Sequence, residues 1–199
     1  MSVLADLYRR IADCEACEEL ATTRTQTVPG MGSRDARLLF IGEAPGFHED
    51  QRGLPFVGPA GQFLDQLLNS IGLARDDVYI CNIIKCRPPG NRDPLPTEIR
   101  NCRHWLDEQL QLVSPKMIVT LGRYSLATFF PGEAIGKIHG KERRSDGMIY
   151  YPMYHPAAAL HQQSLRETIE ADMLRIPSIL ARAEDVEEAD GGPQQLSLF

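Results

Sequence analysis

Apolar residues along the chain fall into short continuous runs, separated by stretches in which they recur with helical spacing. The runs are typical of strands buried on both faces of a sheet, and the spaced stretches are typical of amphipathic helices. Strands that alternate with helices predict an α/β fold with a doubly wound, mostly parallel sheet. The predicted strands are 37–42, 77–82, 117–122 and 148–154, and the predicted helices are 2–13, 60–71, 96–113, 123–130 and 163–182, the last with a kink or break at Pro177.

The segments between these elements have the composition of loops. Pro45 and Gly46 follow the first predicted strand almost at once, so we expect a loop there and no helix before Pro59. The other segments are rich in Thr, Gly and Pro or are basic and punctuated by glycine. The remaining expected loops are 18–36, 83–96 and 131–147.

Three of the predicted strands lead directly into a polar side chain. Glu43 follows the first strand, Asn82 ends the second and His155 follows the fourth. Because the carboxyl ends of parallel strands share one edge, where open α/β sheets bind ligands, we expect these side chains to converge in one cleft. Phe56, on the loop after Glu43, is expected to face the same cleft. Taken singly, Glu43 also fits a helix cap or surface acid, and Phe56 also fits the core.

The net charge of −6 is distributed unevenly along the chain. Residues 183–199 hold five acids and no Lys or Arg, and without them 22 acids face 21 bases. Basic loop residues on a near-neutral body can contact phosphate, although each one alone also fits a solvated charge. We expect one domain at 1–182 and a disordered acidic tail at 183–199. The basic loop residues are Arg87, Arg92, Lys137, Lys141, Arg143 and Arg144.

Cysteine usage points to a metal centre. The N-terminus lacks a signal-peptide pattern and no stretch is long enough to span a membrane, so we expect a cytoplasmic monomer without disulfides. Cys14 and Cys17 are separated by two residues, Cys86 and Cys102 by fifteen, and Cys81 lies inside a predicted strand, where it fits a buried apolar residue. Four paired cysteines suit either zinc or an iron–sulfur cluster, and the pattern alone leaves both open.

Together these blocks resemble the family 4 uracil-DNA glycosylases, the iron–sulfur branch of their superfamily. The order and spacing of the four paired cysteines match, and the resemblance covers about residues 1–180. A related branch, which becomes covalently linked to abasic DNA, carries a histidine in a basic loop, and this chain has none at 87–93. The matching motifs are Gly42-Glu43-Ala44-Pro45-Gly46, Glu49-Asp50, Gly53-Leu54-Pro55-Phe56-Val57-Gly58, Asn82 and His155-Pro156-Ala157-Ala158.

The resemblance implies a three-layer α/β/α fold and hydrolysis of the N-glycosidic bond of deoxyuridine in single- or double-stranded DNA. The nucleotide must first be flipped out of its stack. The resemblance also implies a 4Fe–4S cluster that ties the N-terminal helix to the 83–102 segment. The implied cluster ligands are Cys14, Cys17, Cys86 and Cys102.

The resemblance further implies a role for each site residue. Phe56 would stack on the flipped base and Asn82 would recognise O4 and N3–H of uracil. His155 would donate a hydrogen bond to O2, where negative charge develops. Glu43 would orient the attacking water and stabilise the sugar cation, as acid or base or as a fixed charge. The implied base-contacting residues are Gly42, Gly46, Glu49, Phe56 and Asn82, with Glu49 and the loop around Gly46 as the wall against thymine.

Several alternatives remain open at this point. Leu160 fits a wedge that enters the DNA minor groove and equally fits packing within the last helix. A non-catalytic iron–sulfur or nucleotide-binding module, such as a polymerase accessory domain, is the main competing hypothesis. A zinc-bound structural protein is the second. Neither competitor requires Glu43, Phe56, Asn82 and His155 together, which favours the enzyme.

The C-terminal residues carry a separate motif. Gln195-Leu196-Ser197-Leu198-Phe199 resembles the short peptide by which bacterial replication and repair proteins bind the sliding clamp. In this interpretation Leu198 and Phe199 fill an apolar pocket, Leu196 supports them and Gln195 makes the polar contact. The acidic segment before them acts as a tether. The alternative is a frayed terminus, or one that docks on its own domain.

Overall fold

A six-stranded sheet forms the centre of the molecule, seen in a computed structural model that describes residues 3–145 and 147–182. The strand order is β1-β3-β2-β4-β6-β5, in which the four inner strands are parallel and the two edge strands are antiparallel to their neighbours. The strands are β1 Met31–Gly32, β2 Leu38–Gly42, β3 Tyr79–Asn82, β4 Met117–Leu121, β5 Arg143–Ser145 and β6 Met148–Met153.

The four predicted strands are confirmed as the inner strands, but the predicted count of four is wrong. The strand β1 leaves no pattern in the sequence because it is only two residues long, and β5 leaves none because Arg-Arg-Ser has no apolar run. All five residues of β2 are buried, as expected for a parallel strand covered on both faces. Its register sets Gly42 opposite Asn82 of β3, so the ends of the two strands lie level.

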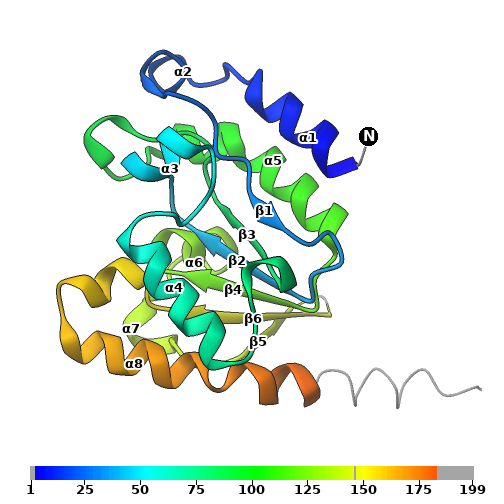
Figure 1. Cartoon of the computed structure of the whole chain (residues 1–199), viewed down its shortest axis with the longest axis vertical. Coiled ribbons are helices and arrows are strands. Elements are labelled where there is room, and N and C mark those ends of the chain that lie inside the picture. The colour runs from blue at the N-terminus through cyan, green and yellow to red at the C-terminus, as the bar shows by residue number, and fades with distance from the viewer. Residues whose placement is uncertain (1–2, 146, 183–199) are drawn as a thin grey trace, which may run out of the picture.

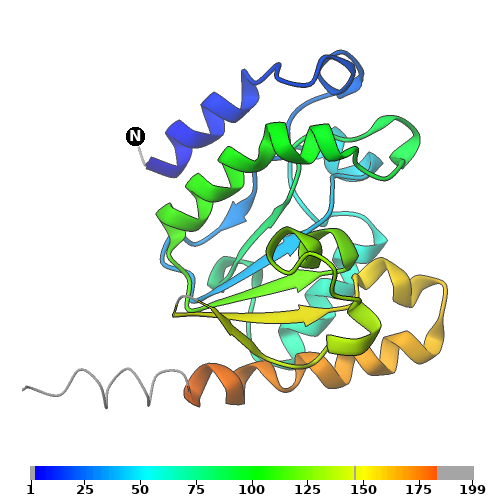
Figure 2. The ribbon, with the colours of Figure 1, turned by 180° about the vertical axis from the view of Figure 1, so that it is seen from behind.

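Helices cover both faces of this sheet and give the three-layer α/β/α arrangement that was expected. In Figures 1 and 2, α1 lies along α5 on one face, while α4 and α8 lie on the other. The α-helices are α1 Val3–Ala12, α2 Glu18–Thr23, α3 Phe47–Arg52, α4 Pro59–Ser70, α5 Pro96–Val113, α6 Arg123–Phe129, α7 Ile135–Ile138 and α8 Gln163–Met173, and the short 3-10 turns are η1 Arg75–Asp77, η2 Pro89–Asn91 and η3 Pro156–Leu160.

Strand alternation divides the apolar residues of β2 between two cores. Leu38 and Phe40 pack with buried residues of α4 and α8, whereas Leu39 and Ile41 pack with those of α1 and α5. Successive side chains of a strand point to opposite faces, which explains why a continuous apolar run serves both layers. The loops at the carboxyl ends of the strands are thereby held between two packed layers.

Three short helices occupy segments that we expected to be loops, namely α2, α3 and α7. The prediction that no helix begins before Pro59 is wrong, because α3 starts immediately after Gly46. Gly46 serves as its N-cap, and its N–H donates to Glu49 Oε2 at 3.2 Å. Glycine is acceptable at this capping position, and an acid in the first turn is favourable. A Pro-Gly pair therefore begins this helix instead of preventing it.

The last predicted helix is broken, as Pro177 indicated. The helix α8 ends at Met173, and helical structure resumes at 176–182. None of the described helices has the length and apolar character needed to cross a bilayer. The predicted tail at 183–199, with its terminal motif, lies outside the described residues.

Candidate functional site

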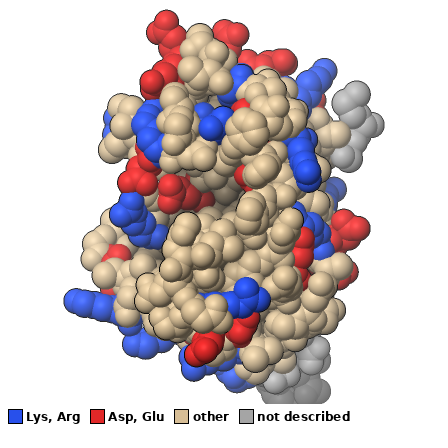
Figure 3. Space-filling model, turned by 60° about the vertical axis from the view of Figure 1, so that its left-hand side comes forward, with Lys and Arg blue, Asp and Glu red and all other residues tan. Residues whose placement is uncertain are grey.

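The carboxyl ends of three inner strands supply the predicted site residues. Glu43 follows β2, Asn82 ends β3 and His155 lies just beyond β6. Because β3, β2 and β6 run parallel within the four inner strands of the sheet, the three residues lie at the same edge. They line two adjoining cavities on the face shown in Figure 3, where a hollow near the middle has acidic groups at its edge and Lys or Arg groups around it.

The first cavity, which we call the base cavity, has a volume of about 180 Å³. This is less than the 300 Å³ or more typical of sites for drug-sized ligands, and it suits a single small ring. Asn82 is 2% exposed, and its Oδ1 has no hydrogen-bond partner among the described residues. A buried acceptor left without a partner is costly, so the cavity is built for a donor that arrives with a ligand. The lining residues are Ala44, Gly46, Glu49, Phe56, Ala60, Asn82, His155 and Ala157.

Gly42 lets the side chains of Asn82 and Phe56 approach each other. A Cβ atom at this position would lie 2.3 Å from Asn82 Oδ1 and 2.6 Å from Cζ of Phe56. Such contacts are closer than atoms can pack, so any other residue would displace the amide or the ring. Gly42 thus leaves the space that the Asn82 amide and the Phe56 ring occupy, and its predicted contact with the base stays a prediction.

Phe56 is held in a conformation that is rare for a non-glycine residue. Its φ angle is 54°, in the left-handed region, and its side chain is 5% exposed. The ring lies nearly parallel to the imidazole of His155, with an interplanar angle of 25° and 5.5 Å between centroids. Left-handed backbone costs an L-residue about 1–2 kcal/mol, so neighbouring contacts must compensate for it.

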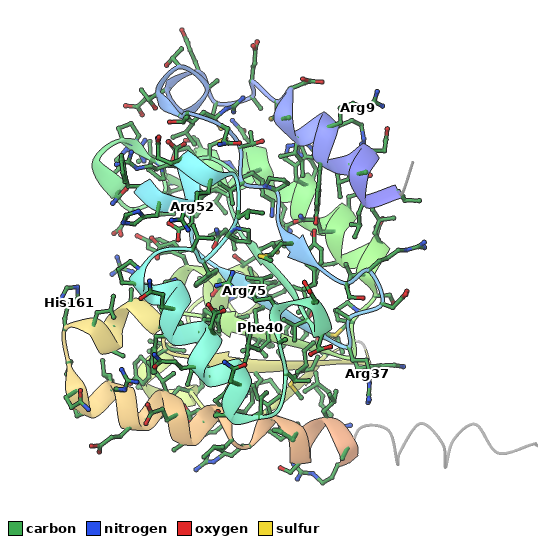
Figure 4. All side chains as sticks on the ribbon, in the orientation of Figure 1. Arg9, Arg37, Phe40, Arg52, Arg75 and His161 are labelled. Carbon is green, nitrogen blue, oxygen red and sulfur yellow. The ribbon has the colours of Figure 1, made fainter. Side chains whose placement is uncertain are left out.

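Arg75 supplies those contacts, and sequence analysis missed it. Its guanidinium donates to the carbonyl oxygens of Pro55 at 2.9 Å and of Phe56. Its Nε donates to Asp65 Oδ1 at 2.5 Å, which fixes the orientation of the guanidinium group. A planar guanidinium with several donors is suited to holding a loop in one geometry. Arg75, labelled near the centre of Figure 4, comes from η1, a segment that no sequence motif associates with the site.

Glu49 lines the base cavity and also organises its walls. Its Oε1 accepts hydrogen bonds from the N–H groups of Val57 and Gly58, both at 2.8 Å. Its other oxygen, Oε2, accepts a hydrogen bond from the main-chain N–H of Gly46. The predicted wall formed by Glu49 and the loop around Gly46 is therefore a connected unit. Whether it rejects thymine stays a prediction.

The second cavity, which we call the Glu43 cavity, has a volume of about 230 Å³. Ala44, Gly46, His155 and Ala157 line both cavities, whereas Glu43 lines only this one and Asn82 only the base cavity. His155 therefore stands at the junction of the two. A ligand that occupied both cavities would pass beside the imidazole.

The imidazole of His155 is prepared to donate a hydrogen bond while neutral. The main-chain N–H of Ala157 donates to its Nδ1 at 3.1 Å, so the ring proton of the neutral form is on Nε2. Burial lowers the pKa of His155 to about 4, and the nearby Glu49 carboxylate opposes this shift. At neutral pH the ring is thus an uncharged donor, of the kind used to stabilise developing negative charge.

Glu43 has a more basic carboxylate than usual. Burial raises its pKa, the carboxylate of Asp93 raises it further and the guanidinium of Arg123 lowers it. Arg123 and Asp93 themselves form an ion pair at 2.5 Å. The sequence pattern does not reveal this pair, because Arg123 begins α6 whereas Asp93 lies in the loop before α5. A carboxylate with a raised pKa is a better proton acceptor, which suits a group that positions water.

The four predicted cluster ligands line one further cavity, between the N-terminal helices and α5. All five cysteines are free thiols, and Cys81 is buried as expected. Side-chain N–H groups reach three of the four ligand sulfurs: Arg24 donates to Cys86 at 3.0 Å, Trp105 to Cys14 at 3.4 Å and Asn101 to Cys17 at 3.6 Å. Donors aimed at sulfur suit thiolates.

Three of the thiols that line this cavity are harder to ionise than ordinary cysteines. Burial raises the pKa of the Cys17 and Cys86 thiols, and it raises the pKa of Cys102 to about 12. Ionised thiolates in this cavity therefore need a nearby cation to stabilise their charge. Among the described residues, no three His, Cys, Asp or Glu side chains are grouped to hold one metal ion. Zinc and a 4Fe–4S cluster both take four thiolates, so the donor set of this cavity fits either group.

Leu160 ends η3 and is 47% exposed. It lies ahead of α8 in a turn that contacts this helix, so the choice between a wedge and packing stays a prediction. Its neighbour His161 is labelled at the outer edge of Figure 4, where it points away from the body. The segment that follows His155 thus presents an apolar side chain to the surroundings of the site.

Comparisons with known proteins agree with this arrangement. The family model "Uracil DNA glycosylase superfamily" matches residues 29–175. The Type-4 uracil-DNA glycosylase of Archaeoglobus fulgidus is 42% identical over 191 residues, which cover 92% of this chain and 96% of that protein. Type-4 uracil-DNA glycosylases of Sulfurisphaera tokodaii and Saccharolobus solfataricus are 44% and 41% identical, covering 88% and 91% of this chain and 84% and 87% of theirs. The chain therefore belongs to the uracil-DNA glycosylase superfamily, as the resemblance implied.

Proposed function

We propose that this chain is a uracil-DNA glycosylase that hydrolyses the N-glycosidic bond of deoxyuridine, releasing uracil and leaving an abasic site as the first step of base excision repair. The observation that carries the proposal is the junction at His155. On one side the base cavity offers the unpaired Oδ1 of Asn82, and on the other the Glu43 cavity offers a carboxylate. A non-catalytic module would have no need for this arrangement.

Recognition of the base follows from the donors and acceptors of the base cavity. Asn82 Oδ1 accepts from N3–H of uracil while its amide N–H donates to O4. Cytosine presents the reverse pattern at both atoms and would leave buried polar groups unpaired, which gives discrimination of about a thousandfold or more. The ring of Phe56 stacks on the flipped base. The unit formed by Glu49 and Gly46 closes the cavity on the side where thymine carries its methyl group.

Bond cleavage uses the two groups that flank the junction. As the bond breaks, negative charge develops on uracil O2, and the Nε2–H of His155 donates to it. Positive charge develops on the sugar, which lies toward the Glu43 cavity. The ionised Glu43 stabilises this charge and orients the water that attacks the sugar carbon. The uracil anion leaves as the water oxygen bonds to carbon, and the proton released by water passes toward the carboxylate.

The direct test is excision from a labelled oligonucleotide that contains one deoxyuridine. The purified protein should yield an abasic site that alkali converts to a strand break, and a thymine-containing oligonucleotide of the same sequence should stay intact. A protein that binds the uracil strand without producing alkali-sensitive sites would contradict the enzymatic proposal and favour the non-catalytic module.

We further propose that Cys14, Cys17, Cys86 and Cys102 hold a 4Fe–4S cluster. The support is the shared cavity, the three N–H donors to sulfur and the Type-4 relatives. When bound, the cluster supplies a covalent link between the segment joining α1 to α2 and the segment that follows β3. Because Asn82 and Cys86 lie on the same short segment, the cluster would steady the base-recognising amide. Free thiols also suit a reducing compartment, for which we propose the cytoplasm.

Replacing Cys14 by alanine is expected to remove the cluster and lower stability, with activity lost as a consequence. The purified wild-type protein should be brown with broad absorbance in the blue region, and Cys14→Ala should be colourless and less soluble. Cys81→Ala is the matched control, because Cys81 is a buried cysteine outside the cavity and should leave the colour intact. A colourless Cys14→Ala variant that keeps full stability and activity would contradict the structural role.

For DNA, we propose that Leu160 acts as the wedge that occupies the space left by the flipped nucleotide. Its exposure and its position after His155 support this role. Apolar wedges partly unstack neighbouring bases and so favour the extrahelical nucleotide. The partner is uracil-containing DNA, and we propose that the protein acts on it as a monomer.

The terminal peptide suggests a second partner, the bacterial sliding clamp. We propose that Gln195, Leu196, Leu198 and Phe199 bind an apolar pocket of that ring through the acidic tether. A tethered enzyme has a higher effective concentration near DNA without any new contact at the active site. The support is the match of the sequence motif alone, over residues 195–199.

Truncation after Pro193 is expected to abolish clamp binding and to leave excision from short oligonucleotides unchanged. Titration of the clamp with the full chain and with the truncated chain measures the first effect, and initial excision rates measure the second. The control is Ser197→Ala, which alters the tail but keeps all four proposed contacts. Equal clamp affinity for full and truncated chains, or no affinity in either, would exclude the tail as an anchor.

A further inference from the structure

An exposed aromatic side chain stands beside the Glu43 cavity and takes no part in the mechanism above. Phe47, the first residue of α3, exposes 51% of its surface. Its chain neighbour Gly46 lines both the base cavity and the Glu43 cavity. Large apolar side chains that stay exposed next to a binding site are often part of an interaction surface. Neither the motifs nor the described packing explains why phenylalanine should be at this position.

Arg87 covers the ring of Phe47. The central carbon of its guanidinium lies 5.1 Å from the ring centroid, a cation–π arrangement. Arg87 precedes Pro88, which lines the Glu43 cavity, and its Nε donates to Asn91 Oδ1 at 2.6 Å. Asn91 lines the same cavity. The Phe47–Arg87 contact thus connects the start of α3 with the 87–91 segment at the rim of the Glu43 cavity.

We infer that the Phe47–Arg87 pair is a stacking platform for an unpaired DNA base next to the flipped nucleotide, an inference that rests on the proposed function. Aromatic rings and guanidinium planes are the two protein surfaces on which splayed bases stack. The positive charge suits the phosphates that flank such a base. His48, whose ring meets the Phe47 ring edge-on with centroids 5.6 Å apart, supports the ring from the side.

The platform has a consequence for strand preference. In a duplex the bases next to the lesion remain stacked on their own neighbours, so they are not free to stack on a side chain. In a single strand the neighbouring base is free, and it gains a stacking partner at the rim of the Glu43 cavity. The platform therefore strengthens the binding of single-stranded substrate. Neither Phe47 nor Arg87 is among the groups that break the glycosidic bond.

The test compares Phe47→Ala and Phe47→Trp with a control variant, Leu174→Ala. Leu174 is 60% exposed at the end of α8 and lines neither cavity of the site. For single-stranded substrate, Phe47→Ala should raise KM about tenfold, the loss of one base–aromatic stack, with kcat within about twofold of the wild type. Phe47→Trp should restore KM. For duplex substrate, all three variants should change KM less than about twofold.

A binding measurement separates stacking from general loss of activity. A single strand carries 2-aminopurine next to 2′-fluoro-deoxyuridine, whose fluorine slows loss of the base. Binding of the wild type and of Leu174→Ala should change 2-aminopurine fluorescence, and Phe47→Ala should lose at least half of that change. Arg87→Lys keeps the charge without the planar surface, so it should reduce the change while leaving the salt dependence of binding unaltered.

Two outcomes would overturn the platform. The first is a KM for Phe47→Ala on single-stranded DNA that equals that of Leu174→Ala, with the fluorescence change intact. The second is an equal rise in KM on single and double strands, which would indicate a contact independent of base stacking. Both presuppose that the wild type excises uracil. If it does not, the proposed function fails first, and the two failures are thereby distinguished.

Discussion

Replacing His155 by alanine should lower the rate of uracil excision by about two to three orders of magnitude. Removal of one preorganised donor to a developing oxyanion typically has an effect of this size. His155 lines both cavities, and its Nε2 carries the proton because the main-chain N–H of Ala157 donates to Nδ1. Single-turnover kinetics at saturating enzyme measure the chemical step. A loss smaller than tenfold would place the donor to O2 elsewhere.

The pH profile provides a control for this assignment. Because burial lowers the pKa of His155 to about 4, the ring stays neutral above that pH and its protonation does not limit the rate between pH 5 and 8. Glu43 has a raised pKa, and it must be ionised to act, so the rate should fall as the pH drops through that raised value. The acid limb should therefore persist in His155→Ala and disappear in Glu43→Gln.

Replacing Asn82 by aspartate should weaken discrimination between uracil and cytosine by about ten- to a hundredfold. The carboxylate accepts a hydrogen bond from N4 of cytosine, which removes one of the two mismatches that the amide imposes. It also repels O4 of uracil, so uracil excision should fall. Paired measurements on oligonucleotides with one unpaired uracil or one unpaired cytosine give the ratio of rates.

Asn82→Ala is the matched control for that experiment. It removes the amide without offering an acceptor to cytosine, so uracil excision should fall while cytosine excision stays at the background. An Asn82→Asp variant that keeps full uracil activity and an unchanged ratio would show that the amide does not recognise the base.

The sequence predicted the inner sheet because burial on both faces leaves an unmistakable apolar run. The same runs located Glu43, Asn82 and His155, since each of these residues stands where a run ends. The convergence of the three followed from the topology of a parallel sheet. The inner strands were therefore sufficient to place the candidate site.

The missed features depend on contacts that the pattern of apolar and polar residues does not record. Arg75 holds the Phe56 loop through main-chain carbonyls, and carbonyls carry no residue identity that a pattern could show. The strand β5 was missed because its exposed residues are polar, and its pairing with β6 alone makes it a strand. The start of α3 was missed because Gly46 serves as a cap where glycine usually signals a break.

The left-handed backbone at Phe56 has a consequence for how this enzyme can be engineered. At that position glycine would relieve about 1 kcal/mol of conformational strain, yet it would remove a ring that is 5% exposed and packed in the core. Truncation of a buried phenylalanine typically costs about 3–5 kcal/mol, so the packing of the ring outweighs the strain of its backbone. A search for heat-resistant variants that screens for folding alone should therefore retain Phe56, and with it the ring proposed to stack on uracil.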